Sequence, residues 1–188
     1  MGTRWGQRLA DLAGGNDVSR TTVDRWLKEM IEVLAAKAPR LQRVLAKIVW
    51  EGGGMVLLDG SLIPGERRAG LPIKRRWSAR DKRHGLLVIA LTDVRGRLSW
   101  TSTARPAHGS EITACRHDDL VGRLRAAGLA AIADLGFVGL DDDRGPDADP
   151  AVITGYKKPR GKKLPPAKKL VNQLIAAKRA VCEHAFAT

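Results

Sequence analysis

The sequence lacks the long apolar run that a membrane-spanning helix requires. Its longest apolar runs, such as Met55–Leu58 and Leu86–Leu91, are far shorter than the ~20 residues of such a helix. The continuous apolar stretch of a secretory signal is also missing, because arginines and aspartates interrupt Met1–Arg20. We therefore expect a cytoplasmic protein with no membrane partner.

Cysteine is scarce as well. Cys115 and Cys182 are the only two, and neither stands at metal-ligand spacing from the other or from the four histidines. A disulfide framework and a zinc site are therefore not indicated. We expect both cysteines to be partly buried packing residues.

Acidic residues are outnumbered: 20 Asp+Glu against 33 Lys+Arg give a net charge of +13. The excess is local, because Gly65–Arg83 has eight basic and two acidic residues and Gly155–Lys169 has seven basic residues and no acidic one. Two such clusters indicate a polyanionic partner. The hydrophobic content of 44% is ordinary for a globular chain with a buried core.

Residues 1–50 predict a small helical domain. The spacing of apolar residues predicts a helix over Gln7–Ala13, a break at residues 14–17, and a second helix that Ser19 caps and that ends near Pro39. This is the layout of a helix-turn-helix, but a plain helical hairpin has the same pattern. A third helix is expected over Leu41–Trp50. In a helix-turn-helix, the second helix would present these side chains to a DNA major groove: Arg20, Thr21, Asp24, Arg25 and Lys28.

Residues 51–188 predict a second domain of mixed α/β class, with helices packed on a mixed sheet. Asp141–Pro150 is expected to be a solvated loop without a catalytic role. The expected strands are Met55–Leu58, Leu86–Leu91, Leu98–Thr101, Leu129–Ala133 and Ala151–Thr154, the first three forming an antiparallel meander, and the expected helices are Glu111–Ala127, closed by Gly128, and about Ala167–Ala187.

Two aspartates stand where buried strands end. Asp59 and Asp134 each follow an apolar run, with Gly60 directly after the first and Gly136 two residues after the second, and strand ends are where mixed α/β folds build their sites. Glu183 follows Arg179 by four residues on the last predicted helix. These three carboxylates predict ligands for two divalent cations, Mg²⁺ or Mn²⁺, in phosphodiester cleavage.

The last helix has two stripes at helical spacing. One stripe is polar apart from one isoleucine, and the neighbouring one is apolar and expected to pack on the rest of the domain. The polar stripe contains Asn172, Ile175, Arg179 and Glu183, and the apolar stripe contains Leu170, Leu174, Ala177 and Val181.

Each acidic residue alone has an ordinary explanation. An Asp-Gly pair after a strand is usually a turn, and a helical Glu four residues after an Arg is usually a surface ion pair. The combination with two basic segments favours the catalytic interpretation.

Four segments, in order, resemble the DDE endonuclease domain of bacterial insertion-sequence transposases related to the Harbinger group. They are VLLDGSLIP, HGLLVIALTDVRGRLSW, LAAIADLGF and VNQLIAAKRAVCEHAFAT. The resemblance runs from about Leu9 to the last residue. It implies a ribonuclease-H-like fold, Asp59, Asp134 and Glu183 as the metal-binding catalytic residues, supporting roles for Asn172 and Arg179, and a strand nick followed by transfer of a 3′ hydroxyl.

The sequence departs from the family pattern at three places. A His-Asp pair of the family is replaced by Ser110 and Glu111, with His108 displaced, so that an auxiliary role for the pair is open. A histidine of the last helix is replaced by Ile175. The chain also stops at Thr188, five residues after Glu183, which predicts a frayed helix end and weak or absent activity in a truncated protein.

The two basic segments flank the expected metal site and are expected to contact DNA phosphates without reading sequence. Trp77 in the first segment is expected either to stack on a base or to anchor the loop. The basic residues expected to contact DNA are Arg67, Arg68, Lys74, Arg75 and Arg76 in the first segment and Lys157, Lys158, Arg160, Lys162 and Lys163 in the second.

These expectations describe a transposase that acts at the nucleoid on transposon terminal inverted repeats and on target DNA, with a homo-oligomer on the DNA as an open question. The alternative is a catalytically inactive remnant that binds transposon ends through its helix-turn-helix and basic loops. A ribonuclease-H-like scaffold without a nucleic-acid partner leaves the charge of +13 unexplained.

Overall fold

The computed structural model describes residues 9–64, 77–78, 83–142, 149–161 and 163–186. The chain forms two compact units, one up to Pro39 and one from Arg40 onward. In the first unit, α1 (Leu9–Gly15) and α2 (Arg20–Lys37) confirm the two expected helices. The expected cap is present too, because the Ser19 hydroxyl accepts a hydrogen bond of 3.1 Å from the Thr22 N–H.

The third helix, α3 (Leu41–Trp50), belongs to the second unit, so that the division falls before it and not at the expected position after residue 50. The physical reason is its apolar face. Leu41, Val44, Leu45 and Ile48 are buried in the main core of the second unit.

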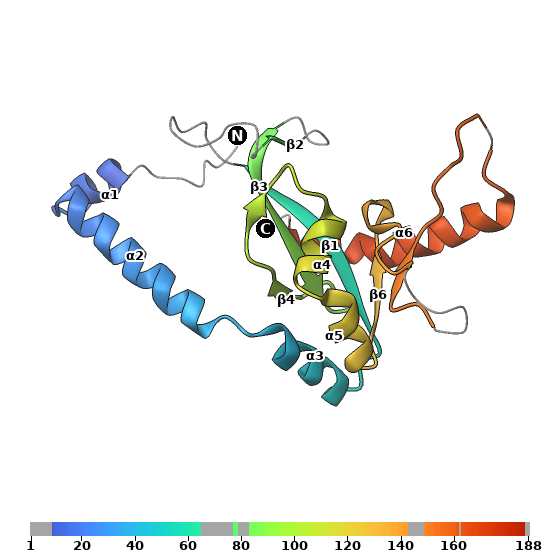
Figure 1. Cartoon of the computed structure of the whole chain (residues 1–188). Coiled ribbons are helices and arrows are strands. Elements are labelled where there is room, and N and C mark those ends of the chain that lie inside the picture. The colour runs from blue at the N-terminus through green and yellow to red at the C-terminus, as the bar shows by residue number, and fades with distance from the viewer. Residues whose placement is uncertain (1–8, 65–76, 79–82, 143–148, 162, 187–188) are drawn as a thin grey trace. The chain divides into compact units, whose positions relative to one another are not determined.

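A mixed sheet is the centre of the second unit (Figure 1). Along its main path the strand order is β2-β3-β1-β6-β7, and β4 and β5 also pair with β3. β1 pairs antiparallel with β3 and parallel with β6, which confirms the mixed α/β class and the antiparallel meander of β1, β3 and β4. The strands are β1 (Met55–Pro64), β2 (Trp77–Ser78), β3 (Arg83–Thr92), β4 (Leu98–Thr101), β5 (Arg105–Pro106), β6 (Ala130–Ala133) and β7 (Val152–Thr154).

The single helix expected over Glu111–Ala127 is wrong. The structure has two helices there, α4 (Glu111–His117) and α5 (Leu120–Ala126). The break lies at Asp119, which adopts a left-handed conformation with φ of 48°. A short polar side chain such as Asp tolerates this conformation better than most residues.

The last helix, α6 (Pro166–Phe186), lies against β1 and β6 within the second unit (Figure 1). The expectation about its packing face is wrong. Leu170 and Leu174 of the apolar stripe are 57% and 59% exposed, whereas Ile175 of the other stripe packs against buried Leu57 and Ile132. The side chains of residues 181–186 lie outside the described part of the structure.

The sheet has a different apolar cluster on each face. Val56, Leu58, Ala131 and Ala133 belong to the main core with α3, α4 and α5. The residues between them along each strand point to the opposite face, because side chains alternate along a strand. On that face a small cluster lies under α6.

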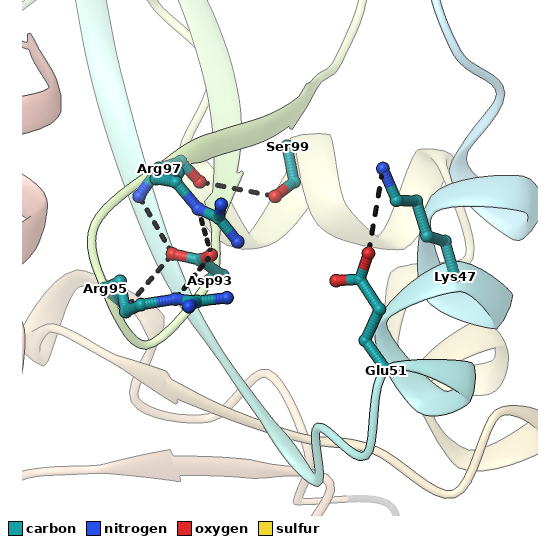
Figure 2. Close-up of polar contacts among 6 residues, drawn as sticks. All are labelled: Lys47, Glu51, Asp93, Arg95, Arg97 and Ser99. Carbon is teal, nitrogen blue, oxygen red and sulfur yellow. Dashed lines mark hydrogen bonds and ion pairs between the residues drawn. The ribbon is translucent and has the colours of Figure 1, made fainter.

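Two polar residues fix the ends of strands. Asp141, expected in a solvated loop, is 8% exposed, accepts a hydrogen bond of 2.8 Å from the Ala151 N–H and pairs with Arg125 at 2.6 Å. That part of the expectation is wrong, because this carboxylate anchors the start of β7. Asp93 organises the turn between β3 and β4 by accepting hydrogen bonds from Arg95 and Arg97 (Figure 2).

Cys115 is buried more deeply than expected, at 1% exposure. Burial, with smaller contributions from the charges of Asp118 and Glu111, raises the pKa of its thiol to about 12. Cys182 lies outside the described side chains. Within the described ranges, no helix has the length and apolar character needed to cross a membrane.

Candidate active site

The pairing of β1 with β6 brings the two aspartates to neighbouring positions. Leu58 of β1 is the register partner of Ala133 of β6 in this parallel pair, and the next residues are Asp59 and Asp134. The backbone of Asp134 is still extended, with φ of −78° and ψ of −179°. Adjacent strands lie ~4.8 Å apart, so the two residues stand side by side at the carboxyl end of β6.

Both aspartates belong to the face of the sheet that α6 covers. Asp59 follows Leu57 by two residues, and Asp134 follows Ile132 by two residues, so each aspartate shares the face of that apolar residue. Leu57 and Ile132 form the cluster beneath Ile175 of α6. The sequence identifies the two strand ends. The structure adds that they are adjacent and face the same helix.

Local hydrogen bonds hold each carboxylate. Asp134 Oδ1 accepts from the Gly136 N–H at 2.7 Å, and Asp59 Oδ1 accepts from the Gly60 N–H at 3.0 Å. Because these donors come from the backbone that follows each aspartate, the carboxylates are oriented by the local chain itself.

Arg179 of α6 reaches the first aspartate. Its Nη2 donates to Asp59 Oδ1 at 3.0 Å, and the two side chains are 19% and 23% exposed. The Nε of Arg179 is buried and has no hydrogen-bond partner among the residues that the structure describes.

Asn172 fixes the same helix to the chain after β7. Its Oδ1 accepts from the Tyr156 N–H at 2.8 Å, and its Nδ2 donates to the Tyr156 carbonyl at 3.0 Å. Ile175 lies one turn later on the sheet, and Arg179 one turn after that. The predicted supporting residues Asn172 and Arg179 thus position α6 over the strand ends.

A cavity of about 630 Å³ opens at this point. Asp134, Asn172, Ile175 and Arg179 line it, and so does Glu111 from the first turn of α4. The sequence leaves the role of Glu111 open, because only the fold brings α4 to the end of β6. His108 is not among the lining residues.

The donor chemistry of Asp59 and Asp134 fits a divalent cation, because carboxylate oxygens on neighbouring strand ends are the ligands that Mg²⁺ and Mn²⁺ prefer. Among the described residues, no group of three or more His, Cys, Asp or Glu side chains is arranged to hold a metal ion. Glu183 lies on α6 one turn after Arg179, but its side chain falls outside the described part.

The basic residues are described only in part. Four residues of the second segment are exposed between β7 and α6: Lys157, Lys158, Arg160 and Lys163. The remaining predicted DNA contacts of the two segments lie outside the described residues: Arg67, Arg68, Lys74, Arg75, Arg76 and Lys162.

The predicted major-groove residues of α2 are at least partly exposed: Arg20, Thr21, Arg25 and Lys28. Two of them join ion pairs along the helix, Lys28 with Asp24 at 2.7 Å and Arg25 with Glu29 at 3.8 Å. This polar surface suits either a DNA contact or a solvated helix face.

A family model described as DDE superfamily endonuclease matches residues 58–188, more than half of the chain. The chain belongs to the DDE superfamily endonucleases. This confirms the resemblance drawn from the four sequence segments, and the ribonuclease-H-like fold is the one that membership of this family implies. The match begins one residue before Asp59 and includes Asp134, Glu111 and Glu183.

Among solved structures, this DDE superfamily endonuclease is similar to a chain of the crystal structure of the Mos1 Strand Transfer Complex. The identity is 16% and the TM-score 0.27, over 71% of this chain and 49% of the other. The chain therefore spans about half the length of that relative. A comparison with curated proteins finds no match.

Proposed function

We propose that this DDE superfamily endonuclease is a transposase, which nicks DNA in a metal-dependent reaction and transfers the 3′ hydroxyl to target DNA. The observation that carries the proposal is the register of β1 and β6, which sets Asp59 beside Asp134 under α6. A turn or a surface ion pair does not require two carboxylates side by side on adjacent strands under one helix, whereas metal-assisted phosphodiester chemistry uses such a pair.

The proposed ligands of Mg²⁺ or Mn²⁺, as a pair of ions, are Asp59, Asp134 and Glu183. The cations, when bound, supply Lewis-acid stabilisation of the charge that develops on the phosphodiester. Arg179 orients the Asp59 carboxylate and limits its repulsion from Asp134. Glu183 follows Arg179 by one helical turn, ~6 Å along α6, so the same docking of α6 governs both residues.

The proposed partner is DNA, with terminal inverted repeats and target DNA as substrates and with assembly of more than one copy on the DNA. Exposed basic residues between β7 and α6 support this proposal, because they stand next to the helix that covers the cavity. Such residues would hold phosphates and leave sequence reading to other elements. The helix-turn-helix interpretation of α1 and α2 would supply that reading.

A second candidate is a DNA-binding protein that has lost catalysis. The departures from the family pattern at Ser110 and Ile175 favour it. Ile175 stands at a position where the family often has a histidine, and here it packs on Leu57 and Ile132. This candidate predicts DNA binding that needs no metal and yields no nick.

The test is nicking of a supercoiled plasmid with Mg²⁺ or Mn²⁺. We expect Asp59→Asn, Asp134→Asn and Glu183→Gln each to lower the rate about 100-fold or more, because a metal ligand supplies several kcal/mol of transition-state stabilisation. Asp142→Asn, at an exposed carboxylate outside the lining of this cavity, is the matched control and should leave the rate unchanged. Nicking rates that are unchanged in all of the first three variants would overturn the catalytic assignment.

A further inference from the structure

Tyr156 follows β7 at the edge of the cavity. Thr154, the last residue of β7, is the register partner of Ala133 of β6 in a parallel pair. The next residues, Gly155 and Asp134, therefore lie side by side, and both line the cavity. Tyr156 comes directly after Gly155, so its ring leaves the chain beside the cavity.

The backbone of Tyr156 is held in place without its ring. The N–H of Tyr156 donates to Asn172 Oδ1 at 2.8 Å, and the carbonyl of Tyr156 accepts from Asn172 Nδ2 at 3.0 Å. Asn172 belongs to α6 and also lines the cavity. The helix that lies over the strand ends thus sets the position from which the ring projects.

The ring of Tyr156 does not act as a core residue. Tyr156 is 45% exposed, and within the described ranges it belongs to neither apolar cluster of the second unit. Two other aromatic residues show the contrast, because Phe137 is buried in the main core and Trp100 packs against it. A tyrosine that anchors a loop buries its ring against apolar neighbours. Anchoring therefore does not account for the exposed ring.

The surface around the ring is basic. The ammonium group of Lys168 lies over the ring, 4.7 Å from its centroid. The sequence has no acidic residue between Asp149 and Glu183. An aromatic ring within a basic surface suits a nucleic-acid strand, whose phosphates attract the cations and whose bases stack on the ring. The other exposed basic residues near Tyr156 in the sequence are Lys157, Lys158, Arg160, Lys163 and Lys169.

An exposed ring distinguishes unpaired from paired DNA. In a duplex, neighbouring base pairs cover the faces of each base, whereas an unpaired base can place its face on an aromatic ring. Basic side chains contact the phosphates of both forms of DNA. The ring of Tyr156 therefore adds a contact that the basic residues do not supply.

We propose that Tyr156 binds the DNA substrate by stacking on one unpaired base of the strand that enters the cavity. The inference rests on the proposed function, because it takes DNA as the partner. Stacking beside Gly155 holds one nucleotide next to the cavity, and the exposed basic residues hold the phosphates of its neighbours.

The test is fluorescence anisotropy of the full chain with a labelled single-stranded oligonucleotide, in EDTA so that no divalent cation takes part. We expect Tyr156→Ala and Tyr156→Leu to weaken binding about tenfold, the effect of losing one base stacked on an aromatic ring. Tyr156→Phe keeps the ring and should bind like the parent protein. Trp50→Ala removes another aromatic residue, one that is 85% exposed, and should leave the affinity unchanged.

Two further measurements separate stacking from charge. Tyr156→Ala should change the affinity for a relaxed closed-circular duplex little, because such DNA presents no unpaired base or end. On the single strand, the loss of affinity should be the same factor at every salt concentration, because the ring neutralises no phosphate. An equal loss on both forms of DNA, or a loss that varies with salt, would contradict stacking on an unpaired base.

Melting temperatures show whether each variant is folded. Tyr156→Leu keeps an apolar side chain and decides the question if Tyr156→Ala does not fold. If the parent protein binds DNA and Tyr156→Leu binds the single strand equally well, the role of Tyr156 is overturned and DNA remains the partner. If the parent protein binds neither form of DNA, the proposed function itself is overturned.

Discussion

At the scale of single residues, the role of a carboxylate depends on the hydrogen bonds that neighbouring groups donate to it. Asp93 accepts hydrogen bonds from the backbone N–H groups of Arg95 and Arg97, each at 2.9 Å, and one of 2.7 Å from Arg97 Nε (Figure 2). Burial alone would raise the pKa of Asp93, but the hydrogen bonds from Arg97 and Arg95 and the charge of Arg97 together hold it below its usual value.

This lowered pKa predicts a pH dependence of stability. A carboxyl whose pKa is lower in the folded state stabilises the fold above its unfolded pKa of about 4, and the contribution disappears as pH falls through the folded pKa. We expect Asp93→Asn to lower the free energy of unfolding by about 1–2 kcal/mol at pH 7. The difference from the parent protein should shrink as the pH falls below about 4. Urea unfolding at neutral and at acidic pH measures it, and an equal difference at both would contradict the explanation.

Residue patterns also show what the sequence can and cannot reveal. Asp59 and Asp134 are predictable because each ends an apolar run and precedes a turn, which is a local signal. Glu111 has no local signal of that kind. In the sequence it stands out only as a departure from a family pair, and its place in the cavity depends on its proximity to Gly60, far away in the chain.

At the scale of elements, α6 shows the limit of helical periodicity. Two neighbouring stripes satisfy the same spacing, and the more apolar one is expected to be buried. The sheet instead takes the stripe with Asn172, Ile175 and Arg179, because the Tyr156 backbone and Asp59 offer partners to its polar residues. Those partners come from other parts of the chain, so the residue pattern of α6 alone does not predict them.

The docking of α6 gives a prediction with a built-in control. We expect Ile175→Ala to lower the free energy of unfolding by about 1–2 kcal/mol, less than for a fully buried residue, because Ile175 is partly buried on Leu57 and Ile132. It should also slow nicking, since Arg179 follows on the same helix. Leu174→Ala, at a residue that is 59% exposed, should change both quantities little.

Urea unfolding and plasmid nicking on the two variants measure these effects. A loss of stability at Leu174 as large as that at Ile175 would contradict the packing face that the structure gives to α6.

The break between α4 and α5 is a similar case. Helical spacing continues through Asp118 and Asp119, so the pattern predicts one helix. The left-handed backbone at Asp119 ends the first helix, and Asp118 accepts a hydrogen bond of 2.6 Å from Arg105 Nη2. The ion pair of Asp118 with Arg105 of β5 thus competes with continuation of the helix. The residue pattern within the helix does not predict this ion pair.

At the scale of the whole molecule, composition and motif order are informative. The mixed α/β class and the order of strands and helices follow from short apolar runs, and the family follows from four segments in order. The boundary between the two units lies at Pro39, earlier than predicted, because the burial of α3 depends on the core it joins. Chain-wide charge indicates a polyanionic partner without locating the residues that bind it.

The net charge predicts salt-dependent DNA binding. We expect the logarithm of the binding constant to fall linearly with the logarithm of salt concentration. Changing the four exposed basic residues between β7 and α6 to Gln should make the slope less steep by about 0.9 for each DNA phosphate that is no longer neutralised. The residues are Lys157, Lys158, Arg160 and Lys163.

The control for this prediction changes four other exposed basic residues to Gln and should leave the slope nearly unchanged. These residues lie at α3 and in the turn between β3 and β4: Arg40, Arg43, Lys47 and Arg95. Fluorescence anisotropy at several salt concentrations gives both slopes. An equal change of slope for both quadruple variants would contradict a specific DNA-binding surface beside α6.

In the proposed function, the carboxylates brought together by β1 and β6 cut DNA with a divalent cation. The most direct measurement is the rate of Mg²⁺-dependent plasmid nicking by the parent protein, Asp134→Asn and the control Asp142→Asn. We expect nicking by the parent protein and the control and a decrease of about 100-fold or more for Asp134→Asn. Equal rates for all three proteins, or no nicking by a folded and DNA-binding parent protein, would contradict it.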